Sequence, residues 1–350
     1  MAKKTVYVLH KNGANSHYIA LKHLLNREAI NLKYREFSIF GNFFKSLVKF
    51  DVALFQKQCI NLAFLVKLVF SKNIKIVLGI APYDSKLLRL SKVLKNHKLY
   101  YHTSWTYWDG TFQPKSTKRA MVKKTWKYFL ENSVEHIFCV SQQSKNQLLE
   151  NYNLEPQNIS VVNHAVDAVF FQDQLSAEKE PLSFIYVGRL VPQKGIDELL
   201  EYFADHPGVK LSLMGSGDME TKVEEFSRRY QNISYYPYTN DKKKIVRLIS
   251  THQYFVLNAK KTDRWEELFG LALIESMAQN TIPIAADHSG PKEIIGKTYG
   301  YVFEEGNIED VLNGIITKNK YDPELSQAVR KRAEYYKVEH ISNLWKPILN

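Results

Sequence analysis

The stretch Thr5-Val-Tyr-Val-Leu-His-Lys-Asn-Gly-Ala-Asn15 begins with a short apolar run suited to a buried strand and continues into a polar loop around Gly13. Apolar residues then recur at helical spacing from Tyr18 to Leu25, which indicates a helix with one buried side. A strand, a glycine-containing loop and a helix in this order are typical of the first βα unit of a doubly wound α/β fold. We therefore expect the chain to begin with such a fold.

The same alternation of strand and helix continues along the chain. Further apolar runs in the first half predict buried strands at residues 52–55, 74–79, 98–102, 136–140 and 159–162. A second series predicts strands at residues 183–187, 210–214, 233–236, 253–257, 282–286 and 299–303. Helical patterns lie between most of these runs. Alternating strands and helices favour a parallel sheet covered by helices on both faces.

A polar and charged segment divides the two series of strands. Residues 172–181 end in Pro181 and predict a linker. We expect an N-terminal domain over residues 1–171, a C-terminal domain over 182–322, and a helix over 323–350 that crosses back to the first domain. A chain of 350 residues is long enough for two such cores. Two doubly wound domains that face each other form a cleft, which is the usual ligand site.

The composition excludes several classes of protein. Hydrophobic residues make up 45% of the chain and charged residues 24%, which is typical of globular proteins. The best apolar stretch, residues 60–70, contains Lys67 and is about half as long as a membrane span. The first residues are too polar for a signal peptide. Cys59 and Cys139 are too few for a disulfide scaffold or a cysteine-rich zinc site, so we expect a cytoplasmic protein.

Positive charge is concentrated in the first half of a chain whose formal net charge is +12. Residues 1–170 contain 25 lysines and arginines against 10 acidic residues, whereas residues 171–350 contain 23 against 26. A basic domain attracts phosphate groups of nucleic acids, anionic lipids or phosphorylated substrates. Two segments, 115–127 and 40–50, combine lysines with apolar residues near helical spacing. Each could lie on an anionic membrane surface or pack as an ordinary core helix with a basic outer face.

The first motif that carries chemistry lies in the second half. The predicted strand 183–187 is followed by Gly188 and Arg189, and Lys194-Gly195 comes shortly afterwards. A glycine allows a tight turn after the strand. Arg189 can bind a phosphate with two parallel hydrogen bonds, and Lys194 can add a point charge. The alternative is an ordinary surface loop with two cations.

The second motif is Glu266-Glu-Leu-Phe-Gly-Leu-Ala-Leu-Ile-Glu-Ser-Met-Ala278. Gly270 interrupts the pattern and a helix follows, so the free backbone N–H groups around it form an anion site. Glu267 precedes the helix and Glu275 lies inside it, where each can face a ligand. The alternatives are that Glu267 only complements the helix dipole and that Glu275 is a solvated helix residue.

Together the two motifs resemble the retaining glycosyltransferases of family 4, which have the GT-B fold of two doubly wound domains facing across a cleft. The resemblance rests on Glu267 and Glu275 with seven residues between them, preceded by Gly188-Arg189 and Lys194-Gly195. It covers residues 181–317 well.

The remaining elements match the family in outline. Asn12-Gly13-Ala14 is similar to the glycine-rich first loop of the family, with one glycine where many members have two. Asn163-His-Ala-Val-Asp167 resembles its Asn-Gly-Val-Asp element, with His164-Ala165 in place of the usual glycine. His288-Ser-Gly-Pro-Lys-Glu293 resembles the later Gly-Gly-x-x-Glu element, again with one glycine.

The resemblance implies an enzyme that transfers a hexose from a nucleotide diphosphate sugar, with UDP as the favoured nucleotide. Arg189 and Lys194 would neutralise the diphosphate as it leaves. Glu267 would contact the transferred sugar, Glu275 would hold the ribose, and Tyr238 would lie near the base. The donor-binding residues that it implies are Gly13, Gly188, Arg189, Lys194, Tyr238, Glu267, Phe269, Gly270, Leu271 and Glu275.

The first domain is expected to supply a polar group at the sugar. The predicted strand 98–102 ends in His102, and doubly wound folds place functional side chains at strand ends. Members of the resembled family often have a histidine there that contacts the donor sugar, so His102 is our first candidate. The alternative is a histidine bonded to a loop carbonyl. His10, His17 and His164 are weaker candidates.

This scheme requires no metal and no other cofactor. Glycosyltransferases that use a divalent metal commonly carry an Asp-x-Asp sequence, and this chain has none. Cationic side chains would stabilise the leaving group instead, which predicts a metal-independent enzyme. The residues expected to take part in catalysis are His102, Arg189, Lys194 and Glu267.

The acceptor is expected to bind the first domain. Its basic and aromatic composition favours a glycan or lipid-linked acceptor, at the cytoplasmic face of a membrane where cell-surface polysaccharide or glycolipid is made. Three alternatives stay open: another GT-B nucleotide-sugar enzyme such as an epimerase or phosphorylase, a basic nucleic-acid-binding protein, and a non-catalytic subunit. The sequence contains no zinc finger, RNP-type strand or long basic tail, so we expect no specific binding of nucleic acid.

Overall fold

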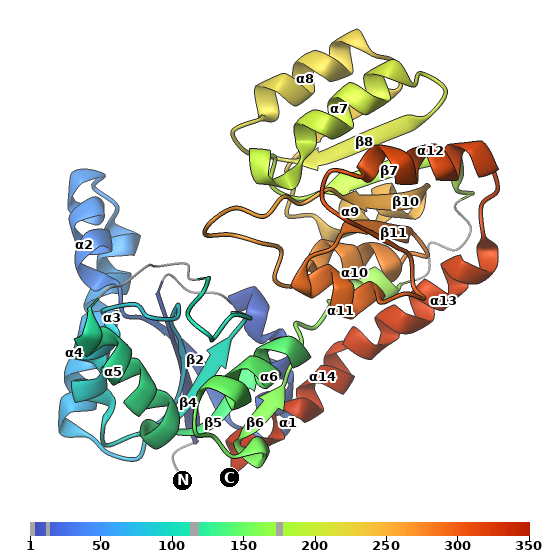
Figure 1. Cartoon of the computed structure of the whole chain (residues 1–350). Coiled ribbons are helices and arrows are strands. Elements are labelled where there is room, and N and C mark those ends of the chain that lie inside the picture. The colour runs from blue at the N-terminus through green and yellow to red at the C-terminus, as the bar shows by residue number, and fades with distance from the viewer. Residues whose placement is uncertain (1–3, 12–14, 113–118, 173–177) are drawn as a thin grey trace. The chain divides into compact units, whose positions relative to one another are not determined.

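The computed structural model describes residues 4–11, 15–112, 119–172 and 178–350. The chain forms two compact units, each built around its own six-stranded sheet (Figure 1). Unit 1 consists of Met1–Ala165 together with Val338–Asn350, and unit 2 consists of Val166–Lys337. The pairings between the strands of both sheets are parallel, which confirms the two doubly wound sheets predicted from the sequence.

The sheet of unit 1 has the strand order β2-β1-β3-β4-β5-β6. Its strands are β1 (Thr5–His10), β2 (Asn31–Glu36), β3 (Lys75–Gly79), β4 (Lys98–Thr103), β5 (Val134–Cys139) and β6 (Ile159–Val161). The order reverses between β1 and β3, because the chain first adds β2 on one side of β1 and then β3 on the other. Doubly wound folds bind ligands at such a reversal, beyond the carboxyl ends of the strands.

Helices bury the apolar strands of unit 1. They are α1 (Ile19–Arg27), α2 (Ile39–Val48), α3 (Val52–Phe70), α4 (Leu87–Leu94), α5 (Ala120–Tyr128), α6 (Gln142–Asn151) and α14 (Val338–Leu344). Local sequence sets the start of two of them. The side chains of Asp51 and Ser141 accept hydrogen bonds from backbone N–H groups in the first turns of α3 and α6, so they act as N-caps.

The sheet of unit 2 has the order β12-β11-β10-β7-β8-β9. Its strands are β7 (Glu180–Val187), β8 (Lys210–Gly215), β9 (Ile233–Pro237), β10 (His252–Leu257), β11 (Ile282–Ala286) and β12 (Tyr301–Phe303). Its helices are α7 (Ile196–Asp205), α8 (Glu220–Arg229), α9 (Lys242–Ser250), α10 (Leu271–Met277), α11 (Ser289–Ile295), α12 (Ile308–Lys318) and α13 (Pro323–Ala333). The order reverses between β7 and β10, which places a second ligand crevice there.

One strand prediction in unit 1 is wrong. Residues 52–55 form the first turn of α3, because Asp51 caps a helix at this point. The position in the sheet belongs instead to β2, which the sequence did not predict. Strand β2 lies at the edge of the sheet and includes Lys33 and Arg35. An edge strand buries fewer side chains than a central one, so no continuous apolar run marked it.

The first passage between the units differs from the predicted domain boundary. Residues 166–171 belong to unit 2, where the backbone N–H of Val166 donates to the carbonyl oxygen of Tyr336 (2.9 Å). Strand β7 begins at Glu180, so the end of the segment 172–181, predicted to be a linker, is part of the sheet.

The C-terminal residues 323–350 do not form the single helix that the sequence predicted. Helix α13 is followed by a turn of 3-10 helix, Glu334–Tyr336, before α14 begins. Helix α13 belongs to unit 2 and α14 to unit 1, so the chain passes between the units after Lys337.

Helix α14 and the residues after it complete the core of unit 1. Trp345 is buried, and its ring lies 4.4 Å from that of Phe138 and 5.3 Å from that of His102. Ile341 and Ile348 belong to the same core cluster as residues of β1 and α1. The last residues of the chain are therefore part of the folded core of unit 1.

Helices α5 and α3 bear on two expectations about apolar segments: α5 agrees with one of the two interpretations left open for its segment, and α3 corrects the other expectation. Helix α5 buries Val122 and Trp126 fully, so its part of the segment 115–127 packs as a core helix with a basic outer face. Residues 115–118 of that segment lie outside the described residues. Helix α3 has 19 residues and, by length and composition alone, is long and apolar enough to cross a membrane, although the sequence was expected to contain no such stretch.

Replacing Trp345 should destabilise unit 1. Trp345→Ala removes a large buried ring, and such a change costs about 3–5 kcal/mol because the cavity refills only in part. We expect a lower midpoint of chemical denaturation by tryptophan fluorescence and circular dichroism. Lys346→Ala, at the exposed neighbouring position, is the matched control and should leave the midpoint unchanged. Equal midpoints for both variants would contradict the role of the C-terminal segment in this core.

Candidate functional site

The crevice of unit 2 lies where the order of its strands reverses. Strand β7 stands between β8 and β10, and the loops that follow β7 and β10 leave the sheet side by side at its carboxyl edge. Gly188 begins the first loop and Asn258 the second. These two loops lead to most of the residues that the sequence singled out.

Gly195 fixes the loop after β7 against the end of β10. Its φ angle of 63° lies in the left-handed region, which favours glycine. A Cβ atom here would lie 2.1 Å from the carbonyl oxygen of Asn258. The Asn258 side-chain amide donates to the carbonyl oxygen of Gly195 (3.1 Å). The preceding residue, Lys194, is thereby held at the crevice.

Lys194 and Glu267 form an ion pair in this crevice. Their side chains are 11% and 15% exposed, and the Lys194 ammonium lies 4.9 Å from the centroid of the Trp265 ring. Each charge compensates for the hydration that the other has lost. The resemblance implied that the two residues bind different parts of a donor, and the structure shows that they contact each other.

Hydrogen bonds from the start of α11 hold the loop that carries Glu267. The Glu267 backbone N–H donates to Nδ1 of His288 (3.1 Å), whose Nε2 lies 2.9 Å from the carbonyl oxygen of Ala259. The N–H of Gly290 donates to the carbonyl oxygen of Glu267 (3.2 Å). A Cβ atom on Gly290 would lie 2.3 Å from the backbone nitrogen of Phe269. This close approach explains why a glycine stands in the 288–293 element.

A cavity of about 240 Å³ lies at the carboxyl ends of β7, β8 and β9, with Arg189 and Tyr238 in its lining. Arg189 and Tyr238 are both exposed, and the Tyr238 hydroxyl bonds the side chain of Asn240. Gly188 also lines the cavity, and a Cβ atom there would lie 2.7 Å from the hydroxyl of Tyr186. The structure thus brings three of the predicted donor residues to one cavity.

Glu275 lies on α10 beside the ion pair of Asp167 and Lys242, whose oxygen and nitrogen are 2.6 Å apart. Burial raises the pKa of Glu275 to about 8; Asp167 acts in the same direction and Lys242 opposes it. The carboxyl group is therefore mostly protonated at neutral pH. The resemblance implies that Glu275 holds the ribose, and in this state its carboxyl group can donate a hydrogen bond as well as accept one.

The other predicted donor residues have less direct placements. The side chain of Phe269 is buried, with its ring 6.1 Å from that of Tyr336. Gly270 has a φ angle of 93° and precedes the seven-residue helix α10, which begins at the partly exposed Leu271. Gly13 lies outside the described residues.

The carboxyl edge of unit 1 carries a cluster of four histidines. Nδ1 of His102 lies 3.1 Å from the hydroxyl of Tyr18, so its contact is not the loop carbonyl of the alternative interpretation. The ring of His164 lies 5.9 Å from that of His102 and 4.5 Å from that of His17. His10, His17 and His102 line one cavity of about 260 Å³. From the sequence alone, these histidines were separate candidates and not a cluster.

The histidines of this cluster are uncharged at neutral pH. Burial lowers the pKa of His10 to about 4 and that of His164 to about 3, and it also lowers the pKa of His17. For His102, burial lowers the pKa well below its usual range, and the three neighbouring histidines add to the effect. Within the described residues, no group of three or more His, Cys, Asp or Glu side chains is arranged to hold a metal ion. Because the pKa values of its histidines are lowered, the cluster offers hydrogen-bonding groups and no positive charge at neutral pH.

Several residues that shape these sites were not singled out from the sequence. Asn258 follows a predicted buried strand, and a polar residue at that position was the available signal. Trp265 and Tyr18 gave no signal, because single aromatic residues are common in cores and loops.

Two family profiles match the chain. The profile described as glycosyl transferases group 1 matches residues 168–335, and the profile described as glycosyltransferase family 4 matches residues 6–170. Together they cover most of both units.

Individual proteins show the same likeness. The gpi3 subunit of phosphatidylinositol N-acetylglucosaminyltransferase from Schizosaccharomyces pombe is 26% identical over 204 residues, which are 54% of this chain and 42% of that protein. The chain spans about half the length of the curated relatives it matches. HepE of Anabaena, solved with UDP, has a TM-score of 0.66 at 13% identity, covering 97% of both chains. The lipopolysaccharide outer core galactosyltransferase WaaB has a TM-score of 0.65 at 18% identity, covering 99% of both.

These structural likenesses concern the fold, and the profiles concern the family. Both agree with the two parallel sheets of the chain. The chain therefore belongs to the group 1 glycosyltransferases, family 4, and has the GT-B fold.

Proposed function

We propose that this protein is a retaining glycosyltransferase that moves a hexose from a UDP-sugar to a glycan or lipid-linked acceptor, in the synthesis of a cell-surface polysaccharide or glycolipid. In this proposal Arg189 and Lys194 bind the donor diphosphate and Glu267 contacts the sugar. The two cations compensate the charge that develops on the leaving diphosphate, so no metal ion takes part. The protein acts in the cytoplasm, with basic unit 1 available to an anionic membrane.

The observation that carries the proposal is the ion pair between Lys194 and Glu267. A diphosphate bears more negative charge than a carboxylate and competes with Glu267 for the ammonium group. Donor binding then leaves a Glu267 oxygen available to a sugar hydroxyl. When the donor leaves, the pair forms again, and neither buried charge is left unpaired.

The cavity beside Arg189 is suited to the rest of the nucleotide. Val187 and Ile245 give it apolar walls, and the exposed ring of Tyr238 can stack on a base. HepE, which shares the fold, was solved with UDP and with UDP-glucose, and this supports UDP as the nucleotide.

The names of two similar proteins support the acceptor class. The Schizosaccharomyces pombe relative is named as a subunit of a phosphatidylinositol N-acetylglucosaminyltransferase, and WaaB as a lipopolysaccharide outer core galactosyltransferase. Both names join sugar transfer to a lipid or a lipid-linked glycan. In unit 1 the uncharged cluster around His102 can hydrogen-bond sugar hydroxyls, because its Nε2 is buried without a partner among the described residues.

Nucleotides should stabilise the protein according to their fit to this site. A ligand at 100 times its dissociation constant stabilises by about 2.7 kcal/mol, so a thermal-shift series with UDP, GDP, ADP and CMP ranks them. We expect the largest rise in melting temperature with UDP and a much smaller rise for Arg189→Ala. Arg228→Ala, on the exposed side of α8, is the control. A UDP shift that survives Arg189→Ala would place the nucleotide elsewhere.

Glu267→Ala and Lys194→Ala should separate turnover from nucleotide binding. Glu267→Ala should lower kcat by on the order of 10²–10³, while UDP binding is retained or strengthened because the carboxylate no longer competes. Lys194→Ala should weaken both, because the diphosphate is present in the ground state and in the transition state. Release of UDP from the donor, coupled to a colour reaction, measures turnover, and calorimetry measures binding.

The matched controls for these variants come from exposed ion pairs of the same unit. Glu224→Ala and Lys222→Ala each break such a pair on α8 and should change neither kcat nor UDP affinity by more than about twofold, because surface pairs contribute little. Normal turnover of Glu267→Ala would show that its assigned role is wrong.

Glu275→Gln should stabilise the protein in a pH-dependent way. The pKa of Glu275 rises from an ordinary value near 4.5 to about 8 on folding, so between these values the unfolded chain releases a proton that the folded chain keeps. Wild-type stability is therefore lost as pH rises through this window. Glutamine cannot ionise, so the variant's advantage in melting temperature should be larger at pH 8 than at pH 5. Glu225→Gln, at an exposed position of α8, should show no such trend; equal advantages at both pH values for Glu275→Gln would contradict the buried neutral state.

A further inference from the structure

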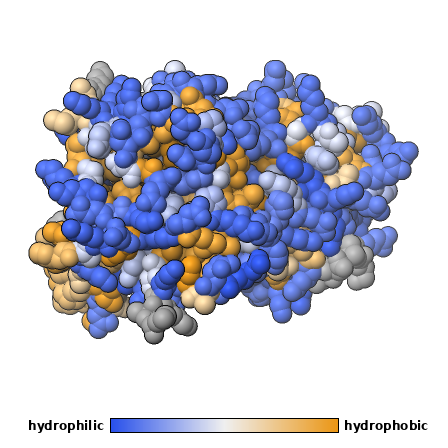
Figure 2. All heavy atoms as spheres, turned by 90° about the horizontal axis from the view of Figure 1, so that it is seen from below, coloured by the Kyte–Doolittle hydropathy of each residue, from blue (hydrophilic) through white to orange (hydrophobic). Residues whose placement is uncertain are grey.

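Helices α2 and α3 expose a large apolar surface on unit 1, here named the α2–α3 face. Its most exposed side chains include those of Phe44, Val48, Phe50, Val52, Val66 and Phe70. Phe50 is 90% exposed and Phe70 85%. In Figure 2, apolar residues gather along the left edge of the molecule, the side on which α2 and α3 lie in Figure 1. Single exposed apolar residues are common, but a face of this size marks an interaction surface.

Helix α3 exposes apolar side chains on its outer side, and its buried side combines two apolar residues, Phe64 and Leu68, with two polar ones. The polar residues Gln58 and Asn61 are buried. The Gln58 amide donates to the carboxylate of Glu36 (3.0 Å), and the Asn61 side-chain oxygen accepts from the backbone N–H of Glu36 (3.1 Å). Lys57 adds an ion pair to the same carboxylate (2.6 Å). A helix that faces water has its polar residues outside, so the outer side of α3 is not suited to water.

The bonds to Glu36 also decide how α3 can meet a membrane. Length and composition alone would allow the helix to cross one. In the fold, however, its inner side is anchored to β2, and it also packs on α2 and α4. Only its outer side is available to apolar surroundings. Such a helix inserts in the plane of the interface and does not span the bilayer.

Lysines accompany the apolar side chains of this surface. Lys45, Lys49 and Lys67 are exposed. Asp51 is the only acidic residue in the sequence between positions 37 and 83, and it is used as the N-cap of α3. An apolar surface with basic residues matches the acyl chains and phosphate groups of an anionic bilayer.

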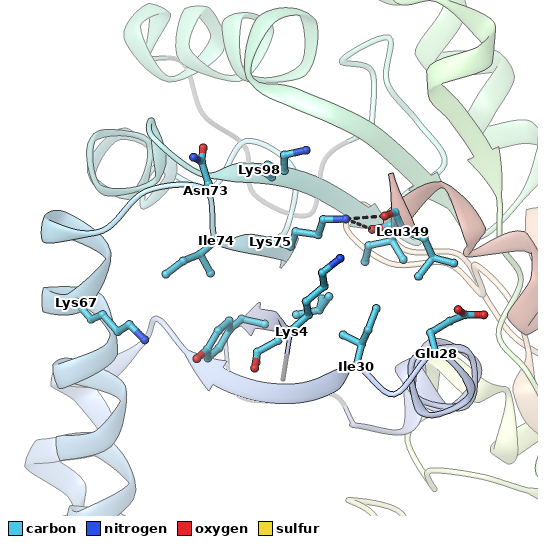
Figure 3. Close-up of a pocket in the computed structure, with 13 residues that line it drawn as sticks. Lys4, Glu28, Ile30, Lys67, Asn73, Ile74, Lys75, Lys98 and Leu349 are labelled. Atoms are coloured by element: carbon cyan, nitrogen blue, oxygen red, sulfur yellow. Dashed lines mark hydrogen bonds between the residues drawn. The ribbon is translucent and has the colours of Figure 1, made fainter. Parts of the chain in front are cut away.

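A cavity of about 650 Å³ extends this positive charge next to α3 (Figure 3). Lys67 points toward it from α3, and Lys4 and Lys98 line it at the amino ends of β1 and β4. The Lys75 ammonium is already bonded to C-terminal carbonyl oxygens such as that of Ile348 (2.9 Å). The cavity lies at the edge of the sheet opposite to the histidine cluster, so its lysines are not part of that cluster.

We propose that the α2–α3 face docks unit 1 onto an anionic lipid bilayer, with α3 lying in the plane of the interface. The apolar side chains enter the acyl region, and Lys45, Lys49 and Lys67 reach the phosphate level. A second copy of the chain on the same face would bring these lysines against each other, which disfavours that occupant. Docking would place the enzyme on the surface that holds a lipid-linked acceptor. This last step rests on the proposed function, whereas the docking does not.

Vesicle binding of the full chain tests the proposal. We expect binding to phosphatidylglycerol–phosphatidylcholine vesicles, little binding to phosphatidylcholine alone, and release by high salt. Replacing three apolar residues, Phe44→Gln, Val66→Gln and Phe70→Gln, should lower the bound-to-free ratio at least tenfold. The control replaces the exposed Met121 and Tyr128 of α5 by glutamine and should bind as the wild type does. Equal binding of the two variants would overturn the proposal.

Cys59 allows the contact itself to be observed. It is exposed on α3, whereas Cys139 is buried, so a polarity-sensitive dye can be attached at this one site. The dye emission should shift to the blue on anionic vesicles and stay unchanged with free glycerol phosphate. Vesicle binding without a blue shift would assign docking to another surface and overturn the proposal. Retention after alkaline carbonate extraction would overturn the in-plane arrangement.

Two further measurements separate the possible failures. Light scattering can show whether the wild type forms a dimer that the triple variant does not form. Such a dimer, together with no vesicle binding by the wild type, would assign the α2–α3 face to a second copy and overturn the proposal. The triple variant should keep the wild-type melting temperature and UDP shift, because its changes are exposed and lie outside unit 2. If the wild type shows the UDP shift but does not bind vesicles, only the docking proposal is overturned. Absence of a UDP shift in the wild type affects only the proposed function.

Discussion

The ion pair that compensates the charge of Lys194 is the interaction on which the candidate site of unit 2 depends. A nearly buried ammonium needs a counter-charge, and three separate segments of unit 2 have to meet to supply it. Gly195 and Asn258 set the position of the lysine, Glu267 provides the carboxylate, and His288 holds the loop of Glu267. Because these loops follow neighbouring strands, the reversal of strand order between β7 and β10 is what brings them together.

The sequence predicted where the candidate residues of unit 2 lie in the sheet better than it predicted their contacts. Gly188, Arg189 and Lys194 follow one strand directly, so a local pattern was enough to place them at the carboxyl edge. The contact of Lys194 with Glu267 joins residues 73 positions apart and depends on β10 lying next to β7. Strand order is a property of the whole sheet, and no local stretch of sequence determines it. For the same reason, the four histidines of unit 1 were visible singly but not as a cluster.

The largest error in unit 1 had one physical origin. Strand β2 is an edge strand with alternating charges, so it left no apolar run, and the run at 52–55 was assigned as a strand instead. Without β2, the buried carboxylate of Glu36 had no place in the predicted fold. Gln58 and Asn61 then had no partner that would turn them inward. A hydrophobic pattern indicates that a helix has two unlike sides, but the partners inside the fold decide which side is buried.

The excess lysines that the structure describes in the first half do not gather at the carboxyl edge of unit 1, where a phosphorylated or lipid-linked substrate would be expected to bind. Among the described residues, Lys11 is the one lysine that lines the histidine cavity at the carboxyl edge of unit 1, and burial lowers the pKa of His10 and His102 in this lining. Exposed lysines instead lie along α2 and α3 and around the cavity at the opposite edge of the sheet. An uncharged crevice suits hydroxyl groups of sugars, whereas a basic outer surface suits phosphate groups held at a distance. In the part of the chain that the structure describes, the positive charge of unit 1 is therefore carried more by its outer surface than by the lining of this crevice.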